Sequence, residues 1–104
     1  MSECIALPHP LRWKNPKFQL GPVYITPAAI VALTFNYVGP VDVLGRHIAG
    51  DWGDLAEADQ AANEQAISDG RRILSVYHLA DGTHLSIVTE ADRRSTTMMC
   101  ADEN

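Results

Sequence analysis

Five residues have the side-chain types that acid–base catalysis on a phosphodiester would need. Arg46 and His47 are adjacent, and histidine is the side chain that most readily exchanges a proton near neutral pH. Arg93 could stabilise a phosphate in the same reaction, with the hydroxyl of Thr97 or Tyr77 assisting. The alternative for Arg46 and His47 is a helix C-terminus, which favours cations without any catalytic role. A catalytic site therefore requires that His47 and Arg93 converge in one cleft.

Segment 50–55, Gly-Asp-Trp-Gly-Asp-Leu, is a second candidate and suggests recognition rather than catalysis. Its two glycines permit backbone conformations that other residues avoid, and Trp52 could anchor either a structural loop or a protein partner. Asp51 and Asp54 flank this tryptophan, and Asp54 could also cap a following helix. Both the structural and the binding interpretation stay open.

Segment 89–97 is the densest polar stretch of the chain. Glu90, Asp92 and Arg93 could form a turn whose charges pair locally. The same run could instead bind an anion, because an arginine beside serine and threonine hydroxyls is a common phosphate ligand set. We therefore include Glu90, Asp92 and Arg93 among the candidate binding residues.

Neither a metal ion nor a cofactor is expected. If Asp81-Gly82 forms a two-residue hairpin loop, Leu79 pairs with His84, which places His78 and His84 on opposite faces of the sheet. No third ligand suggests itself, and structural metal sites usually need four. The Walker, dinucleotide-binding, serine-hydrolase and zinc-protease motifs are all absent.

Charge and length restrict the partners further. The chain has 104 residues, enough for one domain, and a net charge of −5. Segment 51–69 contains six acidic residues and no Lys or Arg. Proteins that bind nucleic acids usually present a basic surface, so this acidic chain is an unusual candidate for that role, although a nucleic-acid partner is not excluded. The acidic segment favours a protein partner with a basic surface. The plain alternative is a solvated helix face.

No targeting or membrane segment is expected. The first residues lack a basic region followed by an apolar stretch, and the longest apolar run, residues 28–33, is far shorter than a bilayer requires. We therefore expect a cytoplasmic protein without a membrane partner.

The pattern of prolines, glycines and apolar residues predicts an α+β fold. Three prolines make residues 1–18 a flexible N-terminal arm, and residues 19–104 then form a single domain. Its expected elements, in order, are one strand within 18–25, helices beginning at Pro27 and Pro40, a third helix over 56–68, and a three-stranded antiparallel meander packed on the helices.

Two predictions of side-chain placement accompany this fold. In the first helix, Ile30, Leu33 and Tyr37 fall on one stripe at helical spacing, so we expect them to pack together. In the meander, the two-residue loop gives a register in which one face is the better core face; its members are Leu74, Val76, His78, Leu85, Ile87 and Thr89. The other face is mixed and could be a homodimer interface.

Two groups of residues resemble a family of small bacterial proteins of unknown function that are encoded on plasmids and other mobile elements. The first group is Arg46-His47, segment 50–55, Asp59, Asn63 and Gly70; the second is segments 74–77, 81–83, 89–93 and 96–97. The resemblance spans residues 20–100 and implies a genomic setting rather than an activity. The chain departs from it at Arg94, where the family has a serine directly after a single arginine, and near Ser86, where the family has an aromatic residue.

Two functions are compatible with these observations. The first is a small non-enzymatic accessory protein of a mobile element that binds another protein, and one version of it counters a host defence system. The alternative is a small ribonuclease or RNA-binding toxin, because the element order also resembles RelE-like and barnase-like folds. The geometry of His47 and Arg93 distinguishes the two.

Overall fold

The computed structural model describes residues 5–6 and 16–101, and residues 1–4, 7–15 and 102–104 lie outside this description. The elements in chain order are β1 (Ile5–Ala6), β2 (Val23–Ile25), α1 (Pro27–Phe35), α2 (Pro40–Ile48), α3 (Glu57–Asp69), β3 (Ile73–His78), β4 (His84–Thr89), the 3-10 helix η1 (Ala91–Arg93) and β5 (Thr96–Cys100). The predicted α+β class, with helices between an N-terminal strand and a three-stranded meander, is confirmed.

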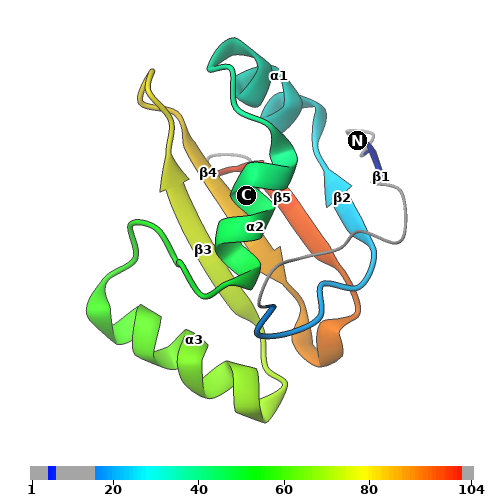
Figure 1. The fold of residues 1–104 in the computed structure, drawn as a ribbon, viewed down its shortest axis with the longest axis vertical. Coiled ribbons are helices and arrows are strands. Elements are labelled where there is room, and N and C mark those ends of the chain that lie inside the picture. The colour runs from blue at the N-terminus through cyan, green and yellow to red at the C-terminus, as the bar shows by residue number, and fades with distance from the viewer. Residues whose placement is uncertain (1–4, 7–15, 102–104) are drawn as a thin grey trace.

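The strands form one mixed sheet in the order β1-β2-β5-β4-β3. β3, β4 and β5 are the antiparallel meander, and β2 runs parallel to β5 with Val23 opposite Thr96. β1 pairs with β2 and is a strand that the sequence did not predict; it falls within the predicted arm, which otherwise lies mostly outside the described residues. Figure 1 shows α1 and α2 lying across one face of the sheet, with α3 beside the β3 edge.

The helix boundaries follow the signals in the sequence. Thr26 accepts a hydrogen bond from the amide of Ala29 at the start of α1, and prolines occupy the first turns of α1 and α2. Gly70 ends α3 in the left-handed conformation, with φ of 71°. α1, however, ends at Phe35, so Tyr37 is 97% exposed and does not share the buried stripe with Leu33. That part of the prediction is wrong because the chain turns at residues 36–38 before Tyr37 can complete another helical turn.

The predicted register of the β3–β4 hairpin is also wrong by one residue. His78 pairs with His84, and Tyr77 pairs with Leu85. The cause is the loop: it spans residues 79–83 and is closed by the Leu79 amide donating to the Thr83 carbonyl at 2.8 Å, rather than being a two-residue turn. Because side chains alternate along a strand, the slip reverses the predicted faces of β3.

The core lies between the helices and the inner face of the sheet. On β3 the buried residues are Ile73, Ser75 and Tyr77, whereas the predicted core residues Leu74, Val76 and His78 point outward; on β4 the predicted Leu85, Ile87 and Thr89 are buried. The main apolar cluster joins residues of β2, α1, α2 and the meander, and a smaller cluster under α3 contains Trp52, Ala66 and Ile73. Phe18 packs against both clusters, so the chain just before β2 belongs to the packed structure.

Candidate functional site

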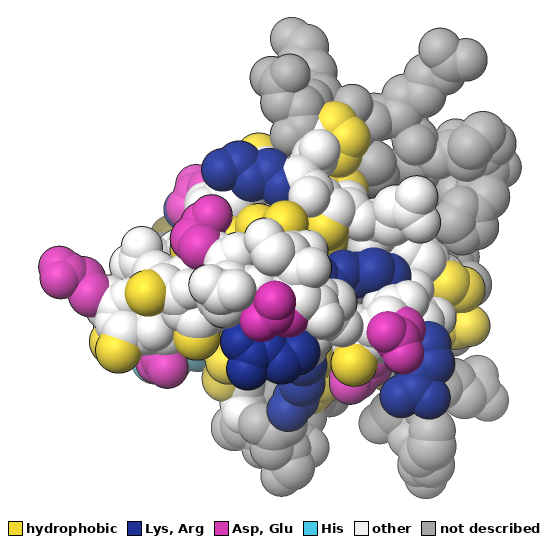
Figure 2. All heavy atoms as spheres, turned by 90° about the horizontal axis from the view of Figure 1, so that it is seen from below, with side chains coloured by type: hydrophobic (Ala, Val, Ile, Leu, Met, Phe, Trp, Pro, Cys, Tyr) yellow, Lys and Arg dark blue, Asp and Glu magenta, His cyan; other side chains and the backbone are white. Residues whose placement is uncertain are grey.

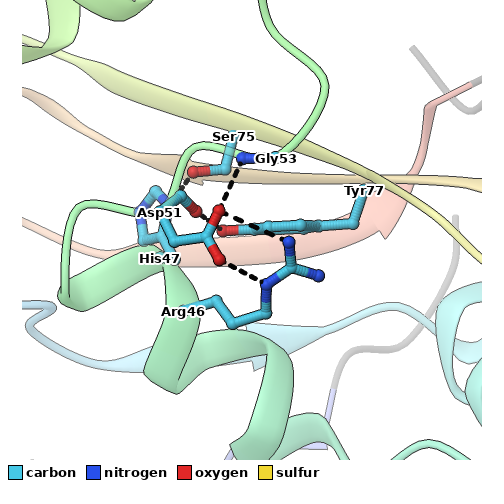
Figure 3. A network of polar contacts seen from close by, with 6 residues as sticks. All are labelled: Arg46, His47, Asp51, Gly53, Ser75 and Tyr77. Carbon is cyan, nitrogen blue, oxygen red and sulfur yellow. Dashed lines mark hydrogen bonds and ion pairs between the residues drawn. The ribbon is translucent and has the colours of Figure 1, made fainter.

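His47 is the centre of a buried chain of hydrogen bonds. Its Nδ1 lies 2.5 Å from Ser75 Oγ on β3, and its Nε2 lies 2.9 Å from Thr89 Oγ1 on β4. Thr89 Oγ1 is 2.8 Å from Thr96 Oγ1, which donates to the Leu20 carbonyl at 2.8 Å. His47, Ser75, Thr89 and Thr96 are all fully buried. Figure 3 shows the His47 and Ser75 side chains facing each other from α2 and β3.

The direction of every proton in this chain follows from its last member. A carbonyl oxygen can only accept, so the Thr96 hydroxyl proton points at Leu20 and Thr96 must accept from Thr89. Thr89 has then used its one proton and accepts from His47, which must therefore carry its proton on Nε2. The network thus fixes a proton on Nε2. When the ring is neutral, Nδ1 has no proton and accepts from the Ser75 hydroxyl, which leaves a single tautomer.

Burial keeps His47 neutral over the physiological range. Loss of solvation, and secondarily the positive charge of Arg93, lowers the pKa of His47 to about 3. The rings of Phe18 and Trp52 lie 5.2 and 5.9 Å from the imidazole and exclude water from it. Neither ring nitrogen is free for a substrate, so His47 lacks the accessible, titrating imidazole that acid–base catalysis needs.

Arg46, Asp51 and Tyr77 form a second, more exposed group beside it (Figure 3). Arg46 Nε donates to Asp51 at 2.7 Å, its guanidinium lies 4.6 Å from the centre of the Tyr77 ring, and the Tyr77 hydroxyl donates to the Asp51 carbonyl at 2.6 Å. The hydrogen bond from Arg46 lowers the pKa of Asp51, and burial raises the pKa of Tyr77 to about 12. These groups hold one another and fasten the end of α2 to β3.

Segment 50–55 completes the edge of the sheet. The Asp54 amide donates to the Val76 carbonyl at 2.8 Å, and the Val76 amide donates to the Trp52 carbonyl at 3.3 Å. Gly53 has φ of 72°, and a Cβ there would lie 2.1 Å from the Val76 carbonyl oxygen, so no other residue fits. Trp52 itself is buried and donates through Nε1 to Glu64 on α3 at 2.9 Å. The segment pairs with β3 and protects an edge that would otherwise be open.

Asn63 on α3 covers the same edge of β3. Its side-chain amide donates to the Leu74 carbonyl at 2.6 Å, and its side-chain oxygen accepts from the Leu74 amide at 3.2 Å. These two bonds give the buried Asn63 side chain its hydrogen-bond partners. They also occupy the Leu74 backbone groups that a neighbouring strand would otherwise bond. Asn63 is one of the residues that carry the family resemblance, and its hydrogen bonds are to the backbone of its own chain.

The polar side chains of segment 89–97 likewise contact other residues of the same chain. Arg93 donates to the carbonyl of Arg71, just after α3, at 2.5 Å and to the carbonyl of Ala66 in the last turn of α3 at 2.8 Å. Glu90 lies 3.9 Å from Arg72, and Asp92 takes a left-handed conformation with φ of 60°. Arg93 is therefore engaged by backbone oxygens rather than free for an anion.

The five candidate catalytic residues do not share one cleft. Thr97 neighbours Thr96 on β5, and because side chains alternate it points to the opposite face of the sheet from His47. Arg93 and His47 contact the same Phe18 ring, at 5.5 and 5.2 Å, so an aromatic side chain stands beside both. Two of the hollows at the surface have volumes of about 280 and 330 Å³; the first is lined by Gly82, Thr83, His84 and Ala101, and the second by Arg72, Leu74, Ser86, Val88 and Met99. None of the five candidates lines either.

His78 and His84 are on the same face, contrary to the prediction. Their rings lie 3.8 Å apart, centre to centre, because the observed register pairs them directly. His78 Nδ1 also contacts the Asp54 carboxylate, which lowers the pKa of that carboxyl. Among the residues that the structure describes, no three metal-ligating side chains are placed to share an ion.

Four of the six large apolar side chains that are exposed among the described residues lie at the corner between α1 and α2. We define the α1–α2 corner as Val31, Phe35, Tyr37 and Val41, whose exposures are 68, 70, 97 and 49%. α1 has only one polar residue, Thr34, and buries Ala29 and Leu33 on one side while Val31 and Phe35 face outward. Helices that are apolar all round are normally covered on every side, whereas the described residues cover this one on one side only.

The end of α1 fixes the position of Tyr37. The Val38 amide donates to the Leu33 carbonyl at 3.0 Å, and the Tyr37 amide donates to the Thr34 carbonyl at 3.1 Å. This is the Schellman arrangement, in which the residue after the cap takes a left-handed conformation and is usually glycine. Here that residue is Tyr37, with φ of 57°.

In comparisons with known proteins, the chain matches no protein family, no curated protein and no solved structure. The resemblance to mobile-element proteins therefore stays a prediction. Within the described residues no single helix is long and apolar enough to cross a bilayer; α1 and α2 together reach that length and composition, but they are bent by 104°.

Proposed function

We propose that this protein is a non-enzymatic protein-binding module and that the α1–α2 corner is its contact surface. The observation that carries the proposal is Tyr37. A tyrosine in the left-handed position costs about 1 kcal/mol relative to glycine. Among the described residues its side chain forms no hydrogen bond and no ring contact that would return this energy to the fold. A residue that destabilises the fold and points into solvent is best explained by a contact with another molecule.

The composition of the corner supports the same function. Tyrosine is enriched among the residues that dominate binding energy, and Phe35, Val31 and Val41 extend its apolar area. The largest apolar patch on a monomeric protein often marks an interaction site.

The corner is also held rigid, which favours binding. Asn36 donates from its side chain to the Ala32 carbonyl at 2.8 Å and accepts from the Asp81 amide at 3.1 Å. These bonds tie the turn after α1 to the β3–β4 loop, which lies at the same end of the molecule in Figure 1. A surface ordered before the encounter loses less conformational entropy on binding.

The other candidate surfaces are already engaged within the protein. Asp51 pairs with Arg46, Asp54 contacts His78, and Glu64 accepts from Trp52, so much of the acidic 51–69 stretch serves the fold. His47 is buried with both nitrogens bonded. These contacts support binding at α1–α2 over both a ribonuclease centred on His47 and recognition through Trp52. The mobile-element setting and a role against a host defence system belong to this proposal as its biological context.

Site-specific photocrosslinking in the cells that encode the protein tests the proposal. A benzophenone amino acid replaces Tyr37 or Phe35, two positions where an aromatic ring is already exposed, and Glu57 on α3 serves as an exposed control position. We expect a discrete adduct of one mass from positions 37 and 35 and none from position 57. Absence of an adduct from both corner positions, or the same adducts from all three, would contradict the proposal. An adduct of twice the chain's mass would show that the partner is a second copy of this chain and not another protein.

A further inference from the structure

We propose that the occupant of the α1–α2 corner is a basic polypeptide segment, in which an aromatic or aliphatic anchor is flanked by Lys or Arg. This inference rests on the proposed function, because it names the chemistry of the partner at that surface. It goes beyond it in predicting the sign of the partner's charge and the residues that select it.

The charged side chains that the described residues bring to the corner are carboxylates. From residue 18 to residue 45 the chain contains no Lys or Arg, and its one charged side chain is Asp42, directly after Val41. The bond from the Asp81 amide to Asn36 brings a second carboxylate, that of Asp81, to the same end of the molecule. The apolar corner therefore has an acidic rim.

Neither of these two carboxylates has a cation of this protein as its partner in the part of the chain that the structure describes. Among the described residues the ion pairs are Arg46–Asp51, Arg71–Asp69, Arg72–Glu90 and His78–Asp54, and neither Asp42 nor Asp81 takes part in one. The Thr83 amide donates to the Asp81 carboxylate at 3.0 Å, which lowers its pKa and keeps it charged at neutral pH. Unpaired charges of one sign at the rim of an apolar surface select partners of the opposite sign.

The same charges argue against the other macromolecules. Nucleic acids and anionic lipid surfaces attract basic patches, so a corner that presents only carboxylates repels both. Four of the described bases lie at the opposite end, where Arg71 and Arg72 directly precede β3, Arg93 ends η1 and Arg94 follows it. Figure 2 views the molecule from that end and shows its Lys and Arg side chains interleaved with Asp and Glu, as the Arg71–Asp69 and Arg72–Glu90 pairs require. The alternative occupant of the α1–α2 corner is this end of a second copy of the chain, and the experiments below distinguish it from a foreign peptide.

A random peptide library displayed on phage tests the inference without a known partner. The library is selected on the wild-type chain after depletion on a Phe35→Ser, Tyr37→Ser double variant, which keeps every carboxylate and removes the apolar anchor site. We expect the enriched peptides to share an aromatic or aliphatic anchor with Lys or Arg on both sides. Enrichment of neutral or acidic peptides would overturn the inference and leave the proposed function standing. No enrichment over the double variant would overturn both.

Charge removal then assigns the selectivity to particular residues. An Asp42→Asn, Asp81→Asn variant keeps the side-chain oxygens that accept backbone hydrogen bonds, and a Glu57→Gln, Asp59→Asn variant makes the same change of charge on exposed α3. We expect an enriched peptide to bind the first variant about fivefold more weakly at low salt, with a smaller dependence on salt, and the second variant as it binds the wild type. Equal effects of the two variants, or none from the first, would contradict the inference. So would sedimentation of the wild-type chain as an oligomer that the Phe35→Ser, Tyr37→Ser change dissociates, because the occupant would then be a second copy.

Discussion

The network around His47 and the α1–α2 corner are opposites in composition and in role. The first contains the histidine, arginines, carboxylates and hydroxyls that suggest chemistry, and its donors and acceptors meet one another inside the fold. The second consists of valines and aromatic residues that suggest a core, and it stays in solvent. Function is therefore better inferred from what a side chain leaves unsatisfied than from its type. By that criterion the motif-like segments build the fold and the bland helix end is the candidate for binding.

The motif-like segments have one structural task in common, which is to complete β3 and α3. Trp52 and Asp54 add a stretch of backbone pairing to the outer edge of β3, and Asn63 bonds to the next residue along that edge. Arg93 bonds to one carbonyl in the last turn of α3 and to one just after the helix. Damage to these segments should therefore reduce stability, and damage to the corner should not.

Substitution of Gly53 should give the largest loss of stability in a test of this difference between the two regions. In Gly53→Ala the new Cβ would lie 2.1 Å from the Val76 carbonyl, in addition to the cost of a positive φ, and we expect a loss of about 3 kcal/mol or more in unfolding free energy. Gly82→Ala is the matched control, because Gly82 also has a positive φ but has nothing within 4 Å of its Cβ. That variant should lose only about 1–2 kcal/mol by chemical denaturation. Equal losses would show that segment 50–55 does not pack on β3 as described.

Acid titration tests the buried His47 network with the next largest effect. The pKa of His47 is about 3 in the folded chain and 6.5 in the unfolded chain, so between these two pH values the unfolded chain binds this proton and the folded chain does not. Stability from this group is therefore complete above pH 6.5 and is lost as pH falls, by about 1.4 kcal/mol per pH unit, or about 2 kcal/mol between pH 6.5 and pH 5.

Denaturant unfolding at several pH values measures this loss, and NMR follows the His47 ring directly. A His84→Gln variant removes an exposed histidine that takes part in none of the ion pairs among the described residues, and it should keep the same loss between pH 6.5 and pH 5. A His47 titration midpoint near pH 6.5, or a single tautomer protonated on Nδ1, would contradict the network.

The order of helices and strands was predictable because its signals are local. Thr26-Pro27, Pro40 and Gly70 each act through their own backbone geometry, so their positions in the sequence set where helices begin and end. The hairpin register was not predictable from Asp81-Gly82, because the Leu79–Thr83 bond that lengthens the loop depends on contacts across it. The parallel pairing of β2 with β5 joins segments far apart in the chain, and no local signal marks it.

The candidate sites divide in the same way. Sequence reasoning singled out Arg46 with His47 and, separately, Asp51. It could not show that Ser75 and Thr89 would bond both nitrogens of His47, because these partners lie on strands far along the chain. It placed Tyr37 on a buried stripe because the helical spacing continues past Phe35. The absence of a glycine between Phe35 and Gly39 was the signal that could have revealed a strained, exposed aromatic residue.

The unfolding free energy of Tyr37→Gly is the most direct test of the central claim that the α1–α2 corner is kept for binding rather than for folding. Glycine relieves the left-handed strain at φ of 57° and removes a side chain that is 97% exposed, so the variant should be more stable than the wild type by about 1 kcal/mol. A Phe35→Ser variant measured beside it should lie within about 0.5 kcal/mol of the wild type. A loss of stability in Tyr37→Gly would show that the tyrosine serves the fold and would contradict the account.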